Sequence, residues 1–372
     1  MNSVENNKSP LREIASVFLK LGCISFGGPL VHVALMEKEI VTRRRWMTPE
    51  HFLDLIGATN LIPGPNSTEM TMHIGQERAG FKGLIVAGLC FILPAVMITA
   101  GFAWAYQKYG TLPEVQPFIY GIKPSIIAVV LFLMIHLAKK AVKSYELAMI
   151  GVVAGILVLF GLSEIAVLFA AGFAAVVRFL IRQRSARINI FVPLALIPVV
   201  SDLKIFWIFL KIGSILYGSG YVLFAFLDDA LVTPGIISKE HLIDAIAVGQ
   251  FTPGPVFSSA TFIGWQIGGA TGALAATLGI FLPSFAFVAL LNPLIPKLRK
   301  SKVMSVFLDA VNVASVAIIS AVILEMGREV LVDWRSILIA IVGFLISYFF
   351  KNVNTAFTIF GGSLLGYGLT FV

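Results

Sequence analysis

The chain of 372 residues is 58% hydrophobic and only 13% charged, with a mean hydropathy of +0.92. These values exclude an ordinary soluble globular protein and indicate a membrane protein. The formal net charge is +8, but the basic residues cluster between apolar runs and form no stripe with interleaved aromatic side chains, so we expect no nucleic-acid partner.

The N-terminal residues 2–13 are polar and mixed in charge, and they show no pattern of a removable signal peptide. The first apolar segment, about 14–36, is predicted to cross the membrane inward and to leave the N-terminus outside. It contains Lys20 and the break Phe26-Gly27-Gly28-Pro29, and the cluster Arg43-Arg44-Arg45 follows it.

The next region, residues 50–78, is predicted to dip into the membrane and return, because Pro63-Gly64-Pro65 interrupts it. Proline removes a backbone donor, and unpaired backbone groups are tolerated at membrane depth only inside protein or beside a watery cavity. Asn66, Ser67 and Thr68 then start a new helix, whose free N–H groups and partial positive charge favour an oxyanion. The alternative is a re-entrant kink that is capped by its own side chains.

Four crossings complete the first half, at about 84–106, 118–138, 146–162 and 164–181. A helix needs about 20 residues to cross a hydrocarbon core of roughly 30 Å, so the shorter runs must recruit flanking residues. The basic clusters follow apolar segments and are assigned to the cytoplasm. They are Arg43–Arg45, Lys139-Lys140 with Lys143, Arg182 with Arg184 and Arg187, and Lys297–Lys302.

The second half repeats the first at an offset of 189 to 191 residues. The correspondences are Lys20 with Lys211, Glu50 with Glu240, Asp54 with Asp244, Pro63-Gly64-Pro65 with Pro253-Gly254-Pro255, and Gly75, Gly80 and Gly83 with Gly264, Gly269 and Gly272. The break Tyr217-Gly218-Ser219-Gly220 corresponds to the first glycine-rich break, Phe26-Gly27-Gly28-Pro29. Ser258 and Ser259 follow the second Pro-Gly-Pro. The predicted segments are about 205–226, 238–268 (re-entrant), 272–294, 303–325, 335–350 and 354–372. A repeat of this length is typical of transporters whose site lies where the halves meet.

Five crossings in each half, an odd number, place the halves in opposite orientations. The predicted fold is an all-α polytopic membrane protein of two inverted structural repeats, with about 10 transmembrane helices plus broken and re-entrant helices. The predicted parts are residues 14–187 (first repeat), 188–204 (linker) and 205–372 (second repeat). Lys8 and Arg12 leave a cytoplasmic N-terminus open, and a spanning Ile188–Val200 would change the parity.

Lys20 and Lys211 lie inside the first crossing of their halves, where an ammonium complements a tetrahedral dianion; snorkelling to the interface is the alternative. The carboxylates Glu50, Asp54, Glu69, Glu240 and Asp244 are candidates for coupling. For all but Glu69 the alternative, which is the more common role of such residues, is a solvated first helical turn stabilised by the helix dipole.

The chain has 2 cysteines and 5 histidines. Cys23 and Cys90 lie in apolar stretches, and none of the histidines shows the spacing of metal ligands. We predict no metal site, no disulfide and no cofactor.

Several motifs resemble the chromate ion transporter family in its two-domain form. They are Phe18–Gly22, Phe26–Pro29, Leu61–Asn66, Gly75, Gly80, Gly83 and Leu93-Pro94 in the first half, with Gly249–Pro255 and Phe281–Pro283 in the second. One departure is Asn60, where the family more often carries glutamine, as this chain does at Gln250.

The resemblance implies export of chromate, with sulfate as a mimic, across the bacterial inner (plasma) membrane, driven by the membrane potential or proton motive force, and hence chromate resistance. The predicted substrate-binding residues are Lys20, Gly27, Gly28, Pro63, Gly64, Pro65, Asn66, Ser67, Thr68, Lys211, Gly218, Gln250, Thr252, Pro253, Gly254, Pro255, Ser258 and Ser259.

Uptake or exchange of another tetrahedral oxyanion, such as sulfate, is the alternative transport function. A membrane enzyme would need a nucleophile, a metal set or a redox motif, and none is visible in the sequence. A structural or signalling role would leave the repeated broken helices unexplained. The expected partners are the oxyanion and the lipid bilayer, and the sequence leaves open whether the protein is a homodimer.

Overall fold

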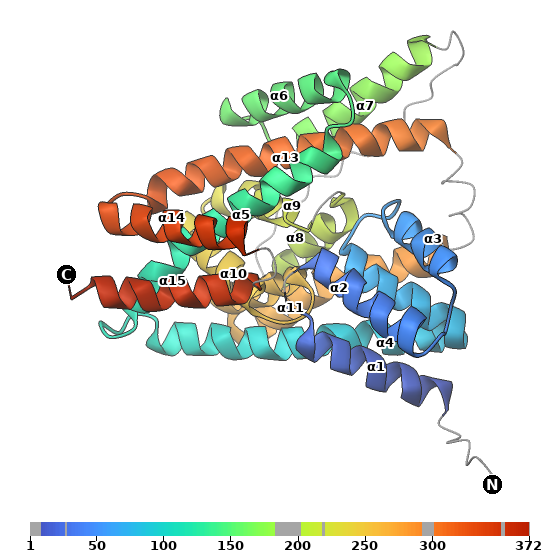
Figure 1. The fold of residues 1–372 in the computed structure, drawn as a ribbon, viewed down its shortest axis with the longest axis horizontal. Coiled ribbons are helices and arrows are strands. Elements are labelled where there is room, and N and C mark those ends of the chain that lie inside the picture. The colour runs from blue at the N-terminus through green and yellow to red at the C-terminus, as the bar shows by residue number, and fades with distance from the viewer. Residues whose placement is uncertain are drawn as a thin grey trace.

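The computed structural model describes residues 9–26, 28–182, 202–217, 220–291, 301–350 and 354–371, and every regular element within them is a helix (Figure 1). The first half contains α1 (Pro10–Ile24), α2 (Pro29–Met36), the π-helix η1 (Glu37–Arg43), α3 (Pro49–Thr59), α4 (Asn66–Tyr109), α5 (Gln116–Ala141), α6 (Tyr145–Leu159) and α7 (Glu164–Arg182). The second half contains α8 (Asp202–Ile215), α9 (Val222–Leu227), the π-helix η2 (Asp228–Val232), α10 (Lys239–Phe251), the 3₁₀ turn η3 (Val256–Ser258), α11 (Ser259–Leu291), α13 (Lys302–Val330), α14 (Trp334–Phe349) and α15 (Thr355–Leu369). Residues 183–201, most of the predicted linker, lie outside the described ranges.

The helices α4 and α11 each consist of two arms that fold back on one another. In α4 the backbone leaves helical geometry at Ala79 and at Gly80, whose φ is +61° and whose ψ is −152°. A Cβ on Gly75 would lie 2.3 Å from the carbonyl oxygen of Gly83, so the two arms touch through their backbones. We call residues 66–78 the first arm of α4 and residues 81–109 its second arm.

The same device recurs in α11, where Gly269 has φ +60° and ψ −147°. Gly264 approaches Gly272 as Gly75 approaches Gly83, with 2.3 Å between the would-be Cβ of Gly264 and the carbonyl oxygen of Gly272. Only glycine adopts the backbone conformation at the fold-back without strain. The repeated glycines in the sequence therefore mark two tight helical hairpins.

Residues 50–78 form the expected re-entrant shape. Thr48 caps α3, Pro49 occupies its first turn, and the helix ends before Pro63-Gly64-Pro65. The imidazole of His51 lies 2.8 Å from the carboxylate of Glu77 near the end of the first arm of α4. The region therefore returns to the level at which it began, with Pro-Gly-Pro at its tip.

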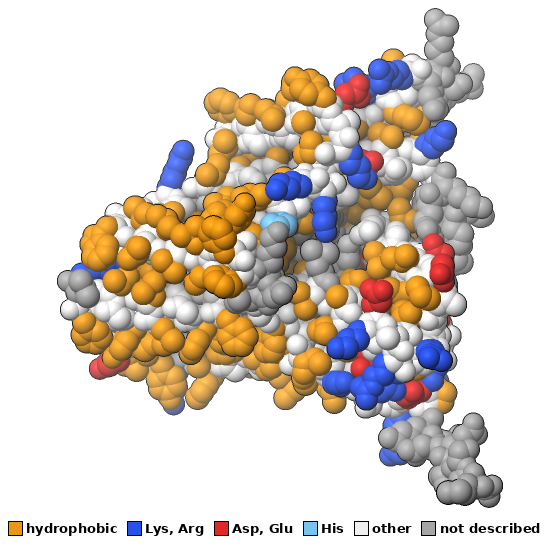
Figure 2. Space-filling view, in the orientation of Figure 1, with side chains coloured by type: hydrophobic (Ala, Val, Ile, Leu, Met, Phe, Trp, Pro, Cys, Tyr) orange, Lys and Arg blue, Asp and Glu red, His pale blue; other side chains and the backbone are white. Residues whose placement is uncertain are grey.

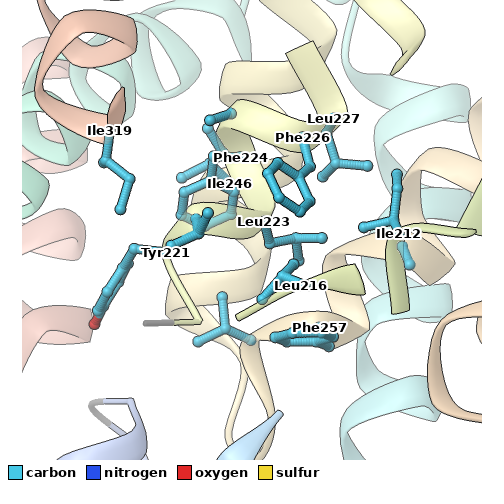
Figure 3. Packing of buried hydrophobic residues seen from close by; sticks show 14 of the residues in the cluster. Ile212, Leu216, Tyr221, Leu223, Phe224, Phe226, Leu227, Ile246, Phe257 and Ile319 are labelled. Atoms are coloured by element: carbon cyan, nitrogen blue, oxygen red, sulfur yellow. The ribbon is translucent and has the colours of Figure 1, made fainter. Parts of the chain in front are cut away.

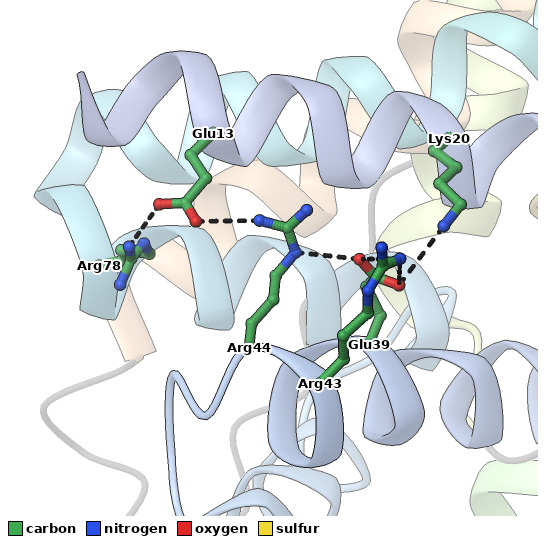
Figure 4. A network of polar contacts seen from close by, with 6 residues as sticks. All are labelled: Glu13, Lys20, Glu39, Arg43, Arg44 and Arg78. Carbon is green, nitrogen blue, oxygen red and sulfur yellow. Dashed lines mark hydrogen bonds and ion pairs between the residues drawn. The ribbon is translucent and has the colours of Figure 1, made fainter. Parts of the chain in front are cut away.

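The prediction that residues 14–36 cross once is wrong. Arg44, after η1, donates to Glu13 at the start of α1 across 2.9 Å, and Arg78 donates to the other carboxylate oxygen of Glu13 across 2.5 Å (Figure 4). The chain reverses at Gly28, which has φ +82°. The start of the chain therefore lies beside the Arg43–Arg45 cluster. The prediction failed because an apolar run in the sequence does not distinguish one long helix from two short helices that fold back on one another.

The two halves interlock. Helix α5 packs against α14 and α15 of the second half, α13 packs against α6 and α7 of the first half, and α4 packs against α11. Small residues permit the close approach: a Cβ on Gly121 of α5 would lie 2.2 Å from the carbonyl oxygen of Gly362 in α15.

The surface is that of a multi-pass membrane protein. Five helices among the described residues are long and apolar enough to span a membrane, namely Asn66–Tyr109, Gln116–Ala141, Glu164–Arg182, Val256–Leu291 and Lys302–Val330. Leu89, Leu93 and Met97 are 44%, 46% and 71% exposed and follow one face of α4, which suits lipid contact. Figure 2 shows hydrophobic side chains over most of the visible face, while charged side chains gather toward the right-hand end.

Candidate functional site

A cavity of about 610 Å³ lies where the broken segments of the two halves meet. Its inner wall contains the residues after both Pro-Gly-Pro tips and residues from both glycine-rich breaks. These residues are Pro29, Pro65, Asn66, Ser67, Gly220, Tyr221, Pro255, Val256 and Phe257. Segments about 190 residues apart therefore border one space, as expected for a site between repeats.

Each Pro-Gly-Pro tip is bonded to the opposite half. The N–H of Gly64 donates to the carbonyl oxygen of Leu216 across 2.8 Å, and the N–H of Gly254 donates to that of Ser25, also across 2.8 Å. Proline has no N–H, so glycine is the sole backbone donor within each tip. Those donors are thus used between the halves, and an anion must be held by the residues that follow.

The start of α4 has the donors for an anion. The N–H groups of Thr68 and Glu69 bind the carbonyl of Pro65, whereas within the described residues no backbone acceptor pairs with the N–H groups of Asn66 and Ser67. The side-chain amide of Asn66 also donates to Oδ1 of Asn60 across 2.8 Å. Both asparagines and Ser67 line the cavity at the positive end of the helix dipole.

The second tip differs from the prediction of a hydroxyl-rich helix start. Val256 and Phe257 face the cavity in a 3₁₀ turn, and α11 begins only at Ser259. Ser258 accepts a hydrogen bond from Thr99 across 3.1 Å and does not line the cavity. Counted from the last proline of each tip, the hydroxyls come one position later than in the first half and so fall on a different face.

The remaining predicted tip residues surround the cavity without lining it. Pro63, Gly64, Thr68, Thr252, Pro253, Gly254 and Gly28 are buried, and a Cβ on Gly28 would lie 2.8 Å from the hydroxyl of Tyr221. Gln250 is buried, and within the described chain Oγ of Ser259 is buried without a hydrogen-bond partner. Gly27 and Gly218 lie outside the described residues.

The two predicted lysines are not part of the cavity wall. Lys20 forms an ion pair with Glu39 of η1 across 3.4 Å, in the network drawn in Figure 4, and its side chain is 48% exposed. Lys211 is exposed on α8. The fold-back of α1 and α2 brings Glu39 opposite Lys20, and the role of both lysines in binding stays a prediction.

The candidate coupling carboxylates occupy three different environments. Glu50 and Asp54 are exposed on α3. Asp244 is buried, accepts the hydroxyl of Tyr106 across 2.6 Å and lies 3.9 Å from Lys123, which also pairs with Glu240.

Glu69 is fully buried in the first arm of α4. Its Oε1 accepts the hydroxyl of Ser284 on α11 across 3.2 Å, and its Oε2 has no partner among the described residues.

The sequence analysis missed a basic rim and a histidine. His136, Lys140 and Lys143 line the outer part of the cavity, and Lys143 pairs with Asp309 across 2.7 Å. The lysine cluster was visible in the sequence but was used only to assign topology. His32, which was considered only as a metal ligand, hydrogen-bonds Ser67 across 3.0 Å.

The comparisons with known proteins agree on one family. A family model described as chromate transporter matches residues 12–176 and again 203–367. A probable chromate transport protein of Synechococcus elongatus is 29% identical, over 91% of this chain and 90% of that protein. The chromate transport protein of Cupriavidus metallidurans is 28% identical, over 96% of this chain and 92% of that protein. No solved structure matches the chain.

Proposed function

This chain belongs to the chromate transporter family, and we propose that it exports chromate, or an oxyanion of the same shape and charge, across the cytoplasmic membrane. Members of this family are transport proteins and not enzymes. The observation that carries the proposal is the cavity between the halves, which reaches the start of α4.

The cavity offers donors that suit an oxyanion. The N–H groups of Asn66 and Ser67 lie at its inner end, with the amide of Asn60 beside them. Lys140 and Lys143 at its outer end attract anions from solution. In the proposal, the first half supplies the polar contacts, and Val256 and Phe257 of the second half supply an apolar wall that excludes water.

We propose that the two halves have opposite orientations in the membrane. Support comes from α5 and α13, which hold corresponding places in the repeat and run antiparallel. Lys143, beyond the end of α5, pairs with Asp309 near the start of α13, and Tyr120, near the start of α5, donates to Asp333, beyond the end of α13. An inverted repeat of this kind permits rocking of one half against the other.

In the proposal, the open end of the cavity faces the cytoplasm. Lys140, Lys143 and Ser301 line its outer part, and basic loops favour the cytoplasm. The other end is held together by Tyr106 with Asp244 and by Lys123 with Glu240. Chromate would enter from the cytoplasm, and rocking would expose the start of α4 to the outside.

The membrane potential favours export of a dianion. With the inside negative, expulsion releases about 4.6 kcal/mol per 100 mV, twice the value for one charge. Glu69 is one candidate for proton coupling, since it is fully buried with one oxygen unpartnered among the described residues. It has no acidic counterpart in the second half, where serines follow the tip.

Transport into everted membrane vesicles tests the proposal. Energised vesicles that contain the protein should accumulate labelled chromate, whereas an importer of sulfate or chromate would not load them. The double variant Asn66→Leu with Ser67→Ala should lose accumulation at equal expression, while Gly101→Ala, on an uncrowded face of α4, should keep it. Equal loading of vesicles that lack the protein would refute the proposal.

The lysines are tested separately in whole cells. If Lys20 and Lys211 help to bind chromate, then Lys20→Ala and Lys211→Ala should each raise chromate accumulation. Unchanged accumulation in both variants at equal expression would remove the lysines from the proposed site and leave the start of α4.

A further inference from the structure

His32 of α2 lies directly behind the proposed anion site. It is fully buried, its Nδ1 lies 3.0 Å from Oγ of Ser67, and its Nε2 lies 3.0 Å from the carbonyl oxygen of Ser25. Its ring stands edge-on to Phe91 with 5.6 Å between centroids. Ser67 in turn lines the cavity, so His32 contacts a side chain that can touch the substrate.

The two hydrogen bonds fix the proton positions of the neutral ring. A carbonyl oxygen only accepts, so Nε2 must carry the hydrogen that is donated to Ser25. In neutral histidine, Nδ1 is then an acceptor, and the hydroxyl of Ser67 donates its only proton to it. In this state Ser67 presents only lone pairs to the cavity, and these repel an oxyanion.

A second proton on His32 reverses this arrangement. Nδ1–H then donates to Oγ of Ser67, and the hydroxyl proton of Ser67 becomes free to bind the anion. We propose that His32 is a proton-binding positioning residue that takes up a proton from solution when the oxyanion binds, and thereby turns the Ser67 hydroxyl toward the anion. The inference rests on the proposed function, and it adds a link between proton and anion.

In the part of the chain that the structure describes, the hydrogen-bond partners of His32 are Ser67 and the carbonyl of Ser25, and both are uncharged. On α1 the charge of Lys20 is paired with Glu39, and on the first arm of α4 Glu69 is bonded to Ser284. The second arm of α4 presents Phe91. Among the described residues no acidic side chain contacts His32, so a buried imidazolium is costly until the anion itself supplies the opposite charge.

The second half has no histidine at the position that corresponds to His32. At the repeat offset of 191 residues, His32 corresponds to Leu223, which is fully buried in the apolar cluster shown in Figure 3. The second tip also presents Val256 and Phe257 to the cavity in place of Asn66 and Ser67. The expected stoichiometry is therefore one proton for each anion.

Calorimetry on the purified full-length protein counts the proton. Sodium chromate is titrated in at about pH 8, where it is a dianion, in two buffers of different ionisation enthalpy. The wild type should take up close to one proton for each chromate, and its affinity should fall about tenfold per pH unit as the pH rises further. His32→Gln and Ser67→Ala should bind more weakly and show neither the uptake nor this slope.

His51→Gln is the matched control, because His51 is exposed, pairs with Glu77 and does not line the cavity. It should keep the wild-type proton count. Chromate binding by the wild type without proton uptake would overturn the inference even if neither variant folds. The same holds if His32→Gln takes up as many protons as the wild type. Failure of the wild type to bind chromate at all would count against the proposed function instead.

Discussion

Tyr106 of α4 donates its hydroxyl to the buried carboxylate of Asp244 on α10 across 2.6 Å. The bond joins the first half to the second half at the end of the molecule opposite the basic rim of the cavity. Lys123 of α5 adds to it, since its ammonium lies 3.9 Å from Asp244 and pairs with Glu240. Three helices are thereby held together where the substrate would have to leave.

Tyr106→Phe should weaken this closed end. Loss of one hydrogen bond to a buried carboxylate costs about 1–3 kcal/mol, which shifts the balance between closed and open states roughly 5- to 150-fold. A cysteine at the buried Ala247, in a background without Cys23 and Cys90, should then react faster with an impermeant maleimide added from outside. Tyr109→Phe is the control, and equal labelling in both variants would show that the bond does not hold the end closed.

Lys140→Gln should slow chromate transport through loss of electrostatic attraction at the cavity rim. Lys139→Gln is a close control, because Lys139 is the adjacent residue and does not line the cavity. Initial rates in everted vesicles should fall severalfold for Lys140→Gln at low salt, and the difference should shrink as salt screens the charge. A deficit that is the same at all salt concentrations would argue against steering.

Gly64→Ala should destabilise the first tip. Gly64 has φ +136°, and its Cβ would lie 2.4 Å from Oε1 of Glu69 and 2.5 Å from Oγ of Ser284. A non-glycine residue in such a conformation costs about 1–3 kcal/mol before the clashes are counted. We expect a lower thermal midpoint in detergent and a loss of chromate binding, whereas Gly101→Ala, with nothing within 4 Å of its Cβ, should behave as the wild type. A thermal midpoint for Gly64→Ala equal to that of the wild type would show that the tip accommodates the added methyl group without loss of stability.

Glu39 should make the hairpin of α1 and α2 sensitive to acid. Burial opposes its ionisation, but the hydrogen bonds from Arg44 and Arg43 and the charge of Lys20 outweigh it and hold the pKa below its usual value of 4.5. The stabilisation is fully present above about pH 4.5 and is lost as the pH falls through the lower pKa of the folded state. Thermal midpoints measured from about pH 6 down to about pH 3 should show this loss.

Glu39→Gln should have a lower midpoint near neutral pH and a shallower fall in acid. Glu37→Gln, at an exposed position two residues earlier on the same helix, should reproduce the wild-type curve. Parallel curves for the wild type and Glu39→Gln would show that other carboxylates govern the acid response.

Family membership and the all-helical character were predictable from the sequence, and so were the helix breaks at the two Pro-Gly-Pro tips. Proline and glycine act locally: they remove a donor or permit φ above zero wherever the rest of the chain lies. The glycines at 75, 80 and 83 likewise marked a real feature, although only the backbone geometry identified it as a fold-back.

What the sequence analysis did not foresee concerns partners that are distant along the chain. Lys20 lies opposite Glu39 because α1 and α2 double back, and this reversal also removed a predicted crossing. Ser258 contacts Thr99, which is 159 residues away, and leaves the cavity to Val256 and Phe257. His32 showed no motif, because its partners Ser25 and Ser67 come from two other elements.

The sequence by itself determined a duplicated, membrane-embedded helical protein with two broken segments per half, because hydropathy and backbone chemistry are properties of short stretches. The tertiary structure decided which polar groups face the common cavity and which are used to join the halves. The outcome depends on side chains and carbonyls that come together only when the helices pack. The N–H of Gly254 donates to the carbonyl oxygen of Ser25, and the hydroxyl of Ser67 forms a hydrogen bond with His32.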